Sequence, residues 1–169
     1  TVLCTAAPNI INQEDYLGAG CSGFSFQNVK YIFYASQLRG NKNILNLVRA
    51  YHKLLRKKHM QIKLILTCRF YKDAEVTNYI QENYLQYDVL SFWGVSKQQL
   101  AALYACAELV VNPTFYEGGF PFTFGEGMSV GTPSVMSKIP QVLDVVEGYS
   151  LEKYMFDPYD VEDMADKIY

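Results

Sequence analysis

From Lys30 onward, short apolar runs alternate along the chain with longer amphipathic stretches. The run "KYIFYAS" at 30–36 is short and mostly apolar, as a buried strand would be, whereas residues 43–59 carry apolar side chains at helical spacing. Strands that are apolar along most of their length and alternate with helices are typical of a parallel sheet covered on both faces. The pattern therefore predicts a doubly wound, Rossmann-like α/β domain.

The same alternation predicts where each element lies. Strands are expected at 30–36, 62–68, 88–94, 108–113, 133–137 and 154–157, and helices at 43–59, 72–84, 96–107, from 121 onward, at 140–147 and from 160 onward. Asn43, Ser96 and Asp160 are the expected N-caps of three of these helices, and Pro121 suits the first turn of another. The domain is thus predicted to occupy residues 30–169.

Residues 1–29 do not share this rhythm and are interpreted as an N-terminal arm or interdomain connector. The segment "GAGCSG" at 18–23 has the spacing of a dinucleotide-binding loop, but it precedes the first strand instead of following one. Because the chain begins at Thr1 without a methionine and stops at Tyr169 inside a predicted helix, we expect it to be a piece of a longer protein.

Charge and hydropathy exclude several classes of function. A formal net charge of -2 over 169 residues argues against a nucleic-acid surface, which is usually strongly basic. The basic cluster at 56–59 ends a helix, where cations complement the dipole; a role at a membrane surface or phosphate is the alternative. No apolar run approaches the roughly 20 residues that span a bilayer, and no signal peptide is recognisable.

Four cysteines, at positions 4, 21, 68 and 106, form no Cys-x-x-Cys pair. Their irregular spacing indicates neither a zinc site nor a disulfide framework. Cys68 ends a predicted strand and Cys106 ends a predicted helix, and both positions suit buried, reduced thiols. This usage favours a cytoplasmic location.

The stretch "PTFYEGGFPFTFGEGMSVGTP" at 113–133 is the candidate site, because it follows a strand of a parallel sheet, where ligands bind. Gly118 and Gly119 bring bare backbone N–H groups to a helix start, which is a favourable place for a phosphate. Gly125 and Gly127 leave space around Glu126. The alternative is that these glycines only permit tight packing of helix on sheet, with both glutamates in solvent.

The order of residues in this stretch resembles the C-terminal, donor-binding half of a GT-B glycosyltransferase of glycosyltransferase family 4, the retaining group 1 enzymes. Those enzymes carry two glutamates bracketing a glycine-proline segment, then a helix of small residues and Gly-x-Pro. The matching residues here are Glu117, Gly118, Gly119, Pro121, Glu126, Met128, Gly131, Thr132 and Pro133. The segments 34–43, 92–114 and 155–168 are similar to the family's phosphate-binding loop, central block and closing block.

The resemblance implies an enzyme that transfers a hexose from a nucleoside diphosphate-sugar, most simply a UDP- or GDP-sugar, without a metal or other cofactor. Lys42, with Arg39 beside it, would neutralise the leaving diphosphate, and Glu117 would orient the sugar hydroxyls. Glu126 would accept hydrogen bonds from the ribose. Other donor-binding residues implied are Gly118, Gly119, Phe120, Ser36, Gln37, Trp93, Gly94, Val95 and Thr114, of which Trp93 to Val95 would edge the nucleobase.

A saccharide or lipid-linked acceptor would be held by an N-terminal domain outside this chain, so the chain alone is expected to be inactive. Such an enzyme of polysaccharide biosynthesis would be cytoplasmic, with peripheral contact to the inner face of the membrane through that other half. No nucleic acid is expected as a partner.

The chain departs from the family pattern twice. Eight residues instead of seven separate Glu117 from Glu126, which leaves the register of Glu117 less certain. Ser36-Gln37 replaces a usual Gly-Arg, so either Arg39 supplies the missing charge or Lys42 acts alone.

Other readings remain open at this point. Lys42 and Arg39 could be structural, with Lys42 ending a loop before a helix. A non-catalytic nucleotide-binding module, or an epimerase or phosphorylase of the same architecture, would share these residues. A glycoside hydrolase would need two carboxylates facing each other across a sugar.

Overall fold

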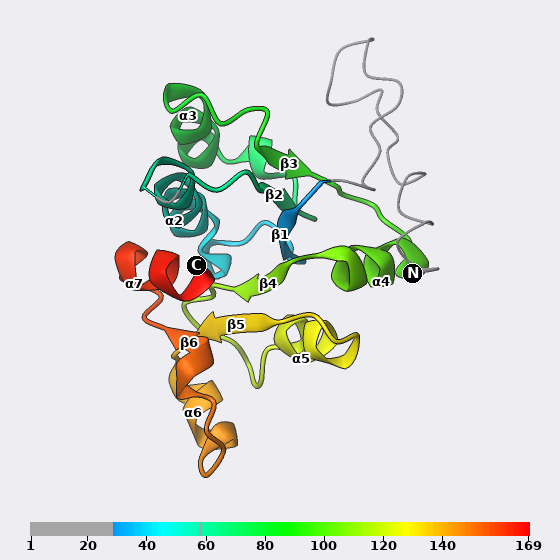
Figure 1. Cartoon of the computed structure of the whole chain (residues 1–169), viewed down its shortest axis with the longest axis vertical. Helices are drawn as coiled ribbons and strands as arrows, with labels where there is room; N and C mark the ends of the chain where they lie inside the picture. Colours follow the sequence, from blue (N-terminus) through cyan, green and yellow to red (C-terminus); the bar gives the residue numbers. More distant parts are fainter. Residues whose placement is uncertain (1–28, 58) are drawn as a thin grey trace.

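The computed structural model describes residues 29–57 and 59–169, which form one parallel sheet flanked by helices (Figure 1). The strands are β1 (Tyr31–Tyr34), β2 (Lys63–Leu66), β3 (Val89–Ser91), β4 (Leu109–Asn112), β5 (Ser134–Ser137) and β6 (Met155–Phe156). Their order across the six-stranded sheet is β3-β2-β1-β4-β5-β6, and all neighbouring pairs are parallel. The chain winds outward from β1 to β3, then crosses to β4 and winds the other way. This is the predicted doubly wound, Rossmann-like sheet.

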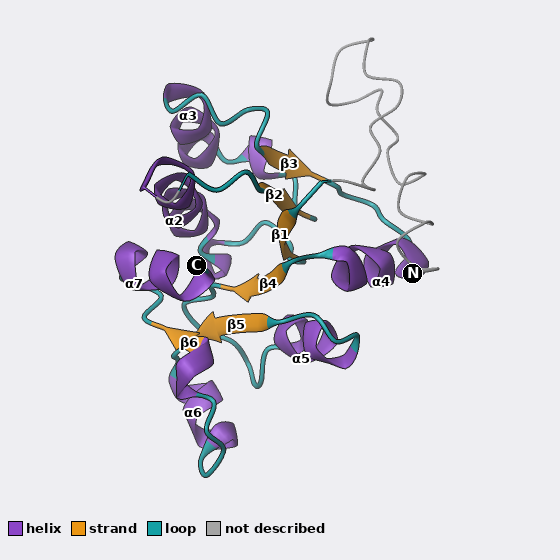
Figure 2. Ribbon diagram, in the orientation of Figure 1, coloured by secondary structure: helices purple, strands orange, loops and turns teal. Residues whose placement is uncertain are grey.

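Helices cover both faces of the sheet (Figure 2). α2 (Ile44–Lys57), α3 (Ala74–Glu82) and α7 (Val161–Ile168) lie on one side, whereas α4 (Lys97–Cys106) and α5 (Phe122–Ser129) lie on the other. α6 (Pro140–Val146) packs beside β5 and β6, through Val142 and Val146 against Met136 and Met155. Short 3-10 turns complete the fold at Gly40–Lys42 (η4), Phe70–Lys72 (η5) and Glu152–Tyr154 (η6).

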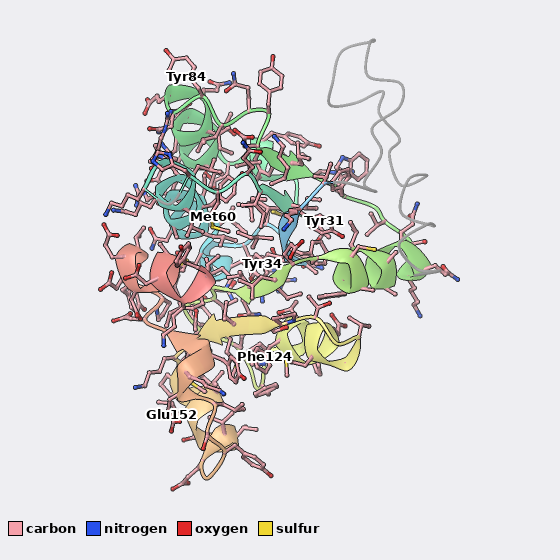
Figure 3. The ribbon with its side chains drawn as sticks, viewed as in Figure 1. Tyr31, Tyr34, Met60, Tyr84, Phe124 and Glu152 are labelled. Atoms are coloured by element: carbon pink, nitrogen blue, oxygen red, sulfur yellow. The ribbon has the colours of Figure 1, made fainter. Side chains whose placement is uncertain are left out.

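The side chains of β1 divide the core into two layers. Ile32 and Tyr34 pack with the residues of α2, α3 and α7, whereas Tyr31 and Phe33 pack with those of α4. Tyr31 and Tyr34, which Figure 3 labels, thus start and end the same central strand but face opposite layers. Burial on both faces explains why this strand is apolar at every position.

Local signals placed most helix boundaries correctly. At the start of α4, the Ser96 side chain accepts a hydrogen bond from the Gln99 N–H, and the Gln99 side chain accepts one from the Ser96 N–H. At the start of α7, the Asp160 side chain accepts hydrogen bonds from the N–H groups of Glu162 and Asp163. Pro121 is the N-cap of α5, one position before the expected first turn. The expectation for Asn43 is wrong: it adopts a left-handed conformation with φ 54°, and its side chain points to other loops.

Two cysteines fall in the described part of the chain. Cys68 is buried after β2 with a free thiol whose pKa is raised by burial to about 11. Cys106 is half-buried at the end of α4.

Several predictions made for the ends and surface of the domain can be placed. The proposed connector, with its "GAGCSG" segment, lies outside the described residues except for Val29. At the basic end of α2, Lys57 Nζ lies 3.0 Å from Glu162 Oε1 on α7. Among the described residues, no helix has the length and apolar character needed to cross a membrane.

Candidate functional site

A pocket of about 440 Å³ opens at the carboxyl ends of β1 and β4, where the winding direction of the sheet reverses. Doubly wound sheets bind their ligands at this position, because the loops on either side of the reversal lead to opposite faces of the sheet and leave a crevice between them. Its lining comes from the end of β1, η4, the end of β4 and the start of α5: Tyr34, Ala35, Lys42, Asn112, Glu117, Gly118, Gly119, Phe120, Pro121, Phe122 and Thr123. Lys42, Glu117, Gly118, Gly119 and Phe120 are predicted site residues, and the structure brings them together.

Lys42 and Glu117 form an ion pair in this pocket. Lys42 Nζ lies 2.5 Å from Glu117 Oε1, and each side chain is 19 % exposed. The pair joins η4 to the loop after β4, over 75 positions of sequence. The structure thus pairs Glu117 with Lys42.

Backbone contacts hold the two loops that carry this pair in place. The Phe115 N–H donates to Asn41 O at 2.9 Å, and Asn41 Nδ2 donates to Tyr116 O at 3.0 Å. Asn43, buried beneath them, donates from Nδ2 to the carbonyls of Pro113 and Pro158, both at 2.8 Å. This role was not predicted, although asparagine is one of the residue types that tolerate a left-handed conformation.

The glycines of the stretch have two different explanations. A Cβ added at Gly118, Gly119 or Gly125 would meet no heavy atom within 4 Å, so packing does not require glycine there. A Cβ at Gly127 would lie 2.4 Å from Ser134 Oγ and 2.9 Å from Val110 Cγ2. The packing alternative therefore holds for Gly127, and the expectation that it makes room for a ligand is corrected, whereas the space at the other three positions is open.

Two polar residues of the pocket lining, Asn112 and Thr123, were not predicted, whereas Thr114 beside them was. Asn112, the last residue of β4, donates to Thr123 Oγ1 in the first turn of α5, and accepts from Thr114 Oγ1 at 2.9 Å. Thr114 is fully buried in this chain of hydrogen bonds, so it supports the floor and does not line the pocket. A polar residue ending an otherwise apolar strand was the available signal.

Two buried hydroxyl groups lie at the end of β1: that of Tyr34, which lines the pocket and was not predicted, and that of Ser36, a predicted donor-binding residue. Tyr34 Oη and Ser36 Oγ are neighbours, yet neither makes a hydrogen bond of normal geometry with any described residue. Burial, and then the charge of Glu117, raise the pKa of Tyr34, so its hydroxyl stays protonated. Ser36 is placed by its backbone, which exchanges hydrogen bonds with Thr67 Oγ1.

Glu126 stands apart from the pocket lining, on the exposed flank of α5. Its Oε2 accepts a hydrogen bond of 2.6 Å from the hydroxyl of Tyr104 on α4. Among the residues that line the pocket, Glu117 is the single carboxylate. A pair of carboxylates facing each other across a sugar, as a glycoside hydrolase uses, is therefore not what this pocket presents.

The remaining predicted residues lie on other loops at this side of the sheet. Arg39 lines a separate cavity of about 290 Å³ together with Asp73 and Glu75 at the start of α3. Trp93 lies under the guanidinium of Arg69, 3.5 Å from ring centroid to Cζ. Gly94 follows with a positive φ of 74°, and Val95 packs against the α4 layer. Gln37 is exposed in the loop between β1 and η4.

Within residues 29–57 and 59–169, no three His, Cys, Asp or Glu side chains gather as a metal site would need.

Comparison with known proteins assigns the chain to a family. Residues 29–169 match the family described as glycosyl transferases group 1. The chain belongs to this family. The match begins at the first described residue and runs to the end of the chain, so the whole of the sheet described above is the part that the family shares.

Relatives and solved structures agree with this assignment. The chain is 32 % identical to the O-antigen chain mannosyltransferase B of Escherichia coli over 134 residues, which are 78 % of this chain and 34 % of the relative. The fold is similar to HepE of Anabaena, whose structure is in complex with UDP and glucose (TM-score 0.70, 20 % identity, 85 % of this chain and 38 % of that one).

A second solved structure is the C-terminal domain of the group 1 protein LpcC from Francisella tularensis (TM-score 0.68, 17 % identity, 83 % of this chain and 74 % of that one). This chain therefore spans about a third of the length of the mannosyltransferase and most of the isolated LpcC domain.

Proposed function

We propose that this chain is the donor-binding half of a retaining group 1 glycosyltransferase, and that the pocket between β1 and β4 holds a nucleoside diphosphate-sugar. One observation carries the proposal: a lysine, a carboxylate and an open glycine loop at a helix start line one pocket at the reversal point of a parallel sheet. A dianionic diphosphate and a hydroxyl-rich sugar need these groups. Family membership supports the reaction type.

In this proposal, Lys42 stabilises the diphosphate as it leaves. Negative charge accumulates on the leaving oxygens in the transition state, and a fixed cation in a partly enclosed site lowers its energy most there. Lys42 has to exchange Glu117 for phosphate as its partner when the donor binds, because the structure pairs the two side chains with each other. Arg39, in a different cavity, has no part in this step.

The loop and α5 supply the other contacts to the donor. The N–H groups of Gly118, Gly119 and Phe120 lie at the start of α5, where the helix dipole also favours an anion. Glu117, released from Lys42, accepts hydrogen bonds from the transferred hexose. Glu126 accepts from the ribose, and the open space at Gly125 beside it agrees with that role.

The acceptor half belongs to the part of the protein that this chain does not include. Since the chain spans about a third of the mannosyltransferase it resembles, we propose that a second domain holds a saccharide or lipid-linked acceptor and that residues 1–29 connect the two. The chain alone is then inactive in transfer, because a reaction needs both substrates positioned. The O-antigen relative favours polysaccharide assembly. We place this activity in the cytoplasm, at the inner face of the membrane, as part of the proposal, which includes no metal.

Titration of the 169-residue chain by calorimetry tests this proposal. The arms are UDP-glucose, GDP-mannose, ADP-glucose and, as controls, glucose and mannose without nucleotide. We expect saturable 1:1 binding of one of the nucleotide-sugars and no binding of the free hexoses. Equal, weak heats from all five ligands would contradict the proposal.

A further inference from the structure

The hydrogen bond between Tyr104 and Glu126 joins the two helices on one face of the sheet. Tyr104 lies in the last turn of α4, and its hydroxyl donates to Glu126 Oε2 on α5 at 2.6 Å. The two residues are 22 positions apart in sequence. Nothing in the local pattern of either helix requires this contact.

Glu126 has little else to fix its side chain. It projects from the exposed flank of α5 between two glycines, and a Cβ added at Gly125 would meet no heavy atom within 4 Å. A glutamate on such a surface exchanges among several rotamers, and the entropy of that freedom is lost when a ligand holds it in one. The contact with Tyr104 restricts the carboxylate before any ligand arrives.

Tyr104 is itself held firmly. Its side chain is 3 % exposed, and its ring meets Phe33 of β1 edge to face, with centroids 5.0 Å apart. Its backbone carbonyl accepts from Thr132 Oγ1 at 2.7 Å, which ties α4 to the turn before β5. Burial and the neighbouring Glu126 raise the pKa of Tyr104, so the hydroxyl remains a donor. A rigid donor thus occupies one oxygen of an otherwise mobile carboxylate.

We propose that Tyr104 is a positioning residue for nucleotide binding: it fixes Oε2 of Glu126 and thereby presents Oε1 as the acceptor for the ribose hydroxyls of a nucleoside diphosphate. This inference rests on the proposed function, in which Glu126 binds the ribose. Tyr104 touches the carboxylate and not the ligand, so its effect reaches the nucleotide only through Glu126.

The test compares a nucleotide that has the ribose hydroxyls with one that lacks them. Dissociation constants of UDP and 2′,3′-dideoxyUDP, or GDP and its dideoxy form if the chain prefers guanosine, are measured for the wild-type chain, Tyr104→Phe, Glu126→Gln and the double variant. Tyr104→Phe keeps the ring on Phe33 and removes the hydroxyl alone. Tyr31→Phe is the matched control, since the Tyr31 hydroxyl is also buried and also donates to α4, at Leu103 O.

We expect Tyr104→Phe to weaken the binding of UDP by about three- to ten-fold, the usual effect of one net hydrogen bond. The dissociation constant of dideoxyUDP should stay within about twofold of the wild-type value. Glu126→Gln should reduce the discrimination further, and adding Tyr104→Phe to it should change nothing more. Tyr31→Phe should discriminate as the wild type does. A purely structural link between α4 and α5 would instead weaken both nucleotides equally.

Two results would overturn the inference in distinguishable ways. If Glu126→Gln loses the discrimination but Tyr104→Phe keeps it in full, Tyr104 does not position the carboxylate, and the ribose assignment survives. If Glu126→Gln itself keeps the discrimination, or if neither nucleotide binds, the ribose assignment fails and takes the inference with it.

Discussion

At the scale of single residues, the ion pair between Lys42 and Glu117 decides how the pocket responds to an anion. Both side chains are about four-fifths shielded from solvent, so their attraction is less screened than that of a surface pair. An incoming diphosphate has to compete with Glu117 for Lys42. Glu117 therefore neutralises the charge of Lys42 in this pocket, and binding of a diphosphate exchanges one anionic partner of the lysine for another.

Changing Glu117 to glutamine should make this competition visible. Glu117→Gln keeps the size of the side chain but removes its charge, so we expect the affinity for free nucleoside diphosphate to rise by about three- to ten-fold. Transfer by the full-length enzyme should fall, because the hexose loses its charged partner. Glu108→Gln, which removes the partner of Lys30 in an exposed pair, should leave both quantities unchanged. A weaker diphosphate affinity in Glu117→Gln would show that the carboxylate does not compete.

At the scale of secondary-structure elements, α5 combines a packed side and an open side. Gly127 faces β4 and β5 so closely that a methyl group would overlap Ser134 and Val110, whereas Gly125 faces open space. Two glycines that look alike in the sequence therefore differ in what they permit. One lets the helix approach the sheet, and the other leaves its flank uncovered next to Glu126.

Alanine substitutions should separate these two roles. Gly127→Ala overpacks the helix-sheet contact and should lower the free energy of unfolding by about 1–3 kcal/mol. Gly125→Ala should raise it by about 0.5–1 kcal/mol, because alanine is the better residue in a helix. Urea unfolding of both variants checks this, and equal effects would mean that α5 does not approach the sheet as described.

The sequence predicted the elements well because their burial repeats locally. β1 is buried on both faces, so every one of its residues is apolar, and α4 carries its own capping box in Ser96 and Gln99. The contacts that finish the site were not predictable in this way. These contacts join residues of different elements, so they depend on how the helices and the sheet pack. They are Asn112 with Thr123, Tyr104 with Glu126, and Gly127 with Ser134.

At the scale of the whole molecule, the sheet order explains why the site residues meet. β1 and β4 are neighbours although two further strands lie between them in the sequence, and so the loops that carry Lys42 and Glu117 face each other. The side chain of Asn43, which has a left-handed backbone conformation, holds these loops together by donating hydrogen bonds to the loops after β4 and β6. The resemblance implied that Lys42 and Glu117 are site residues, but it did not imply that they form an ion pair.

The central claim is that Lys42 binds the diphosphate of a nucleotide-sugar, and the most direct test is the affinity of Lys42→Ala for that donor. Lys30→Ala is the matched control, since Lys30 also pairs with a glutamate but lies before β1, away from the pocket. We expect Lys42→Ala to weaken donor binding by about 10- to 100-fold, the loss of a hydrogen bond to a charged group, and Lys30→Ala to bind the donor as the wild type does. Donor affinity in Lys42→Ala equal to that of the wild type would contradict the account.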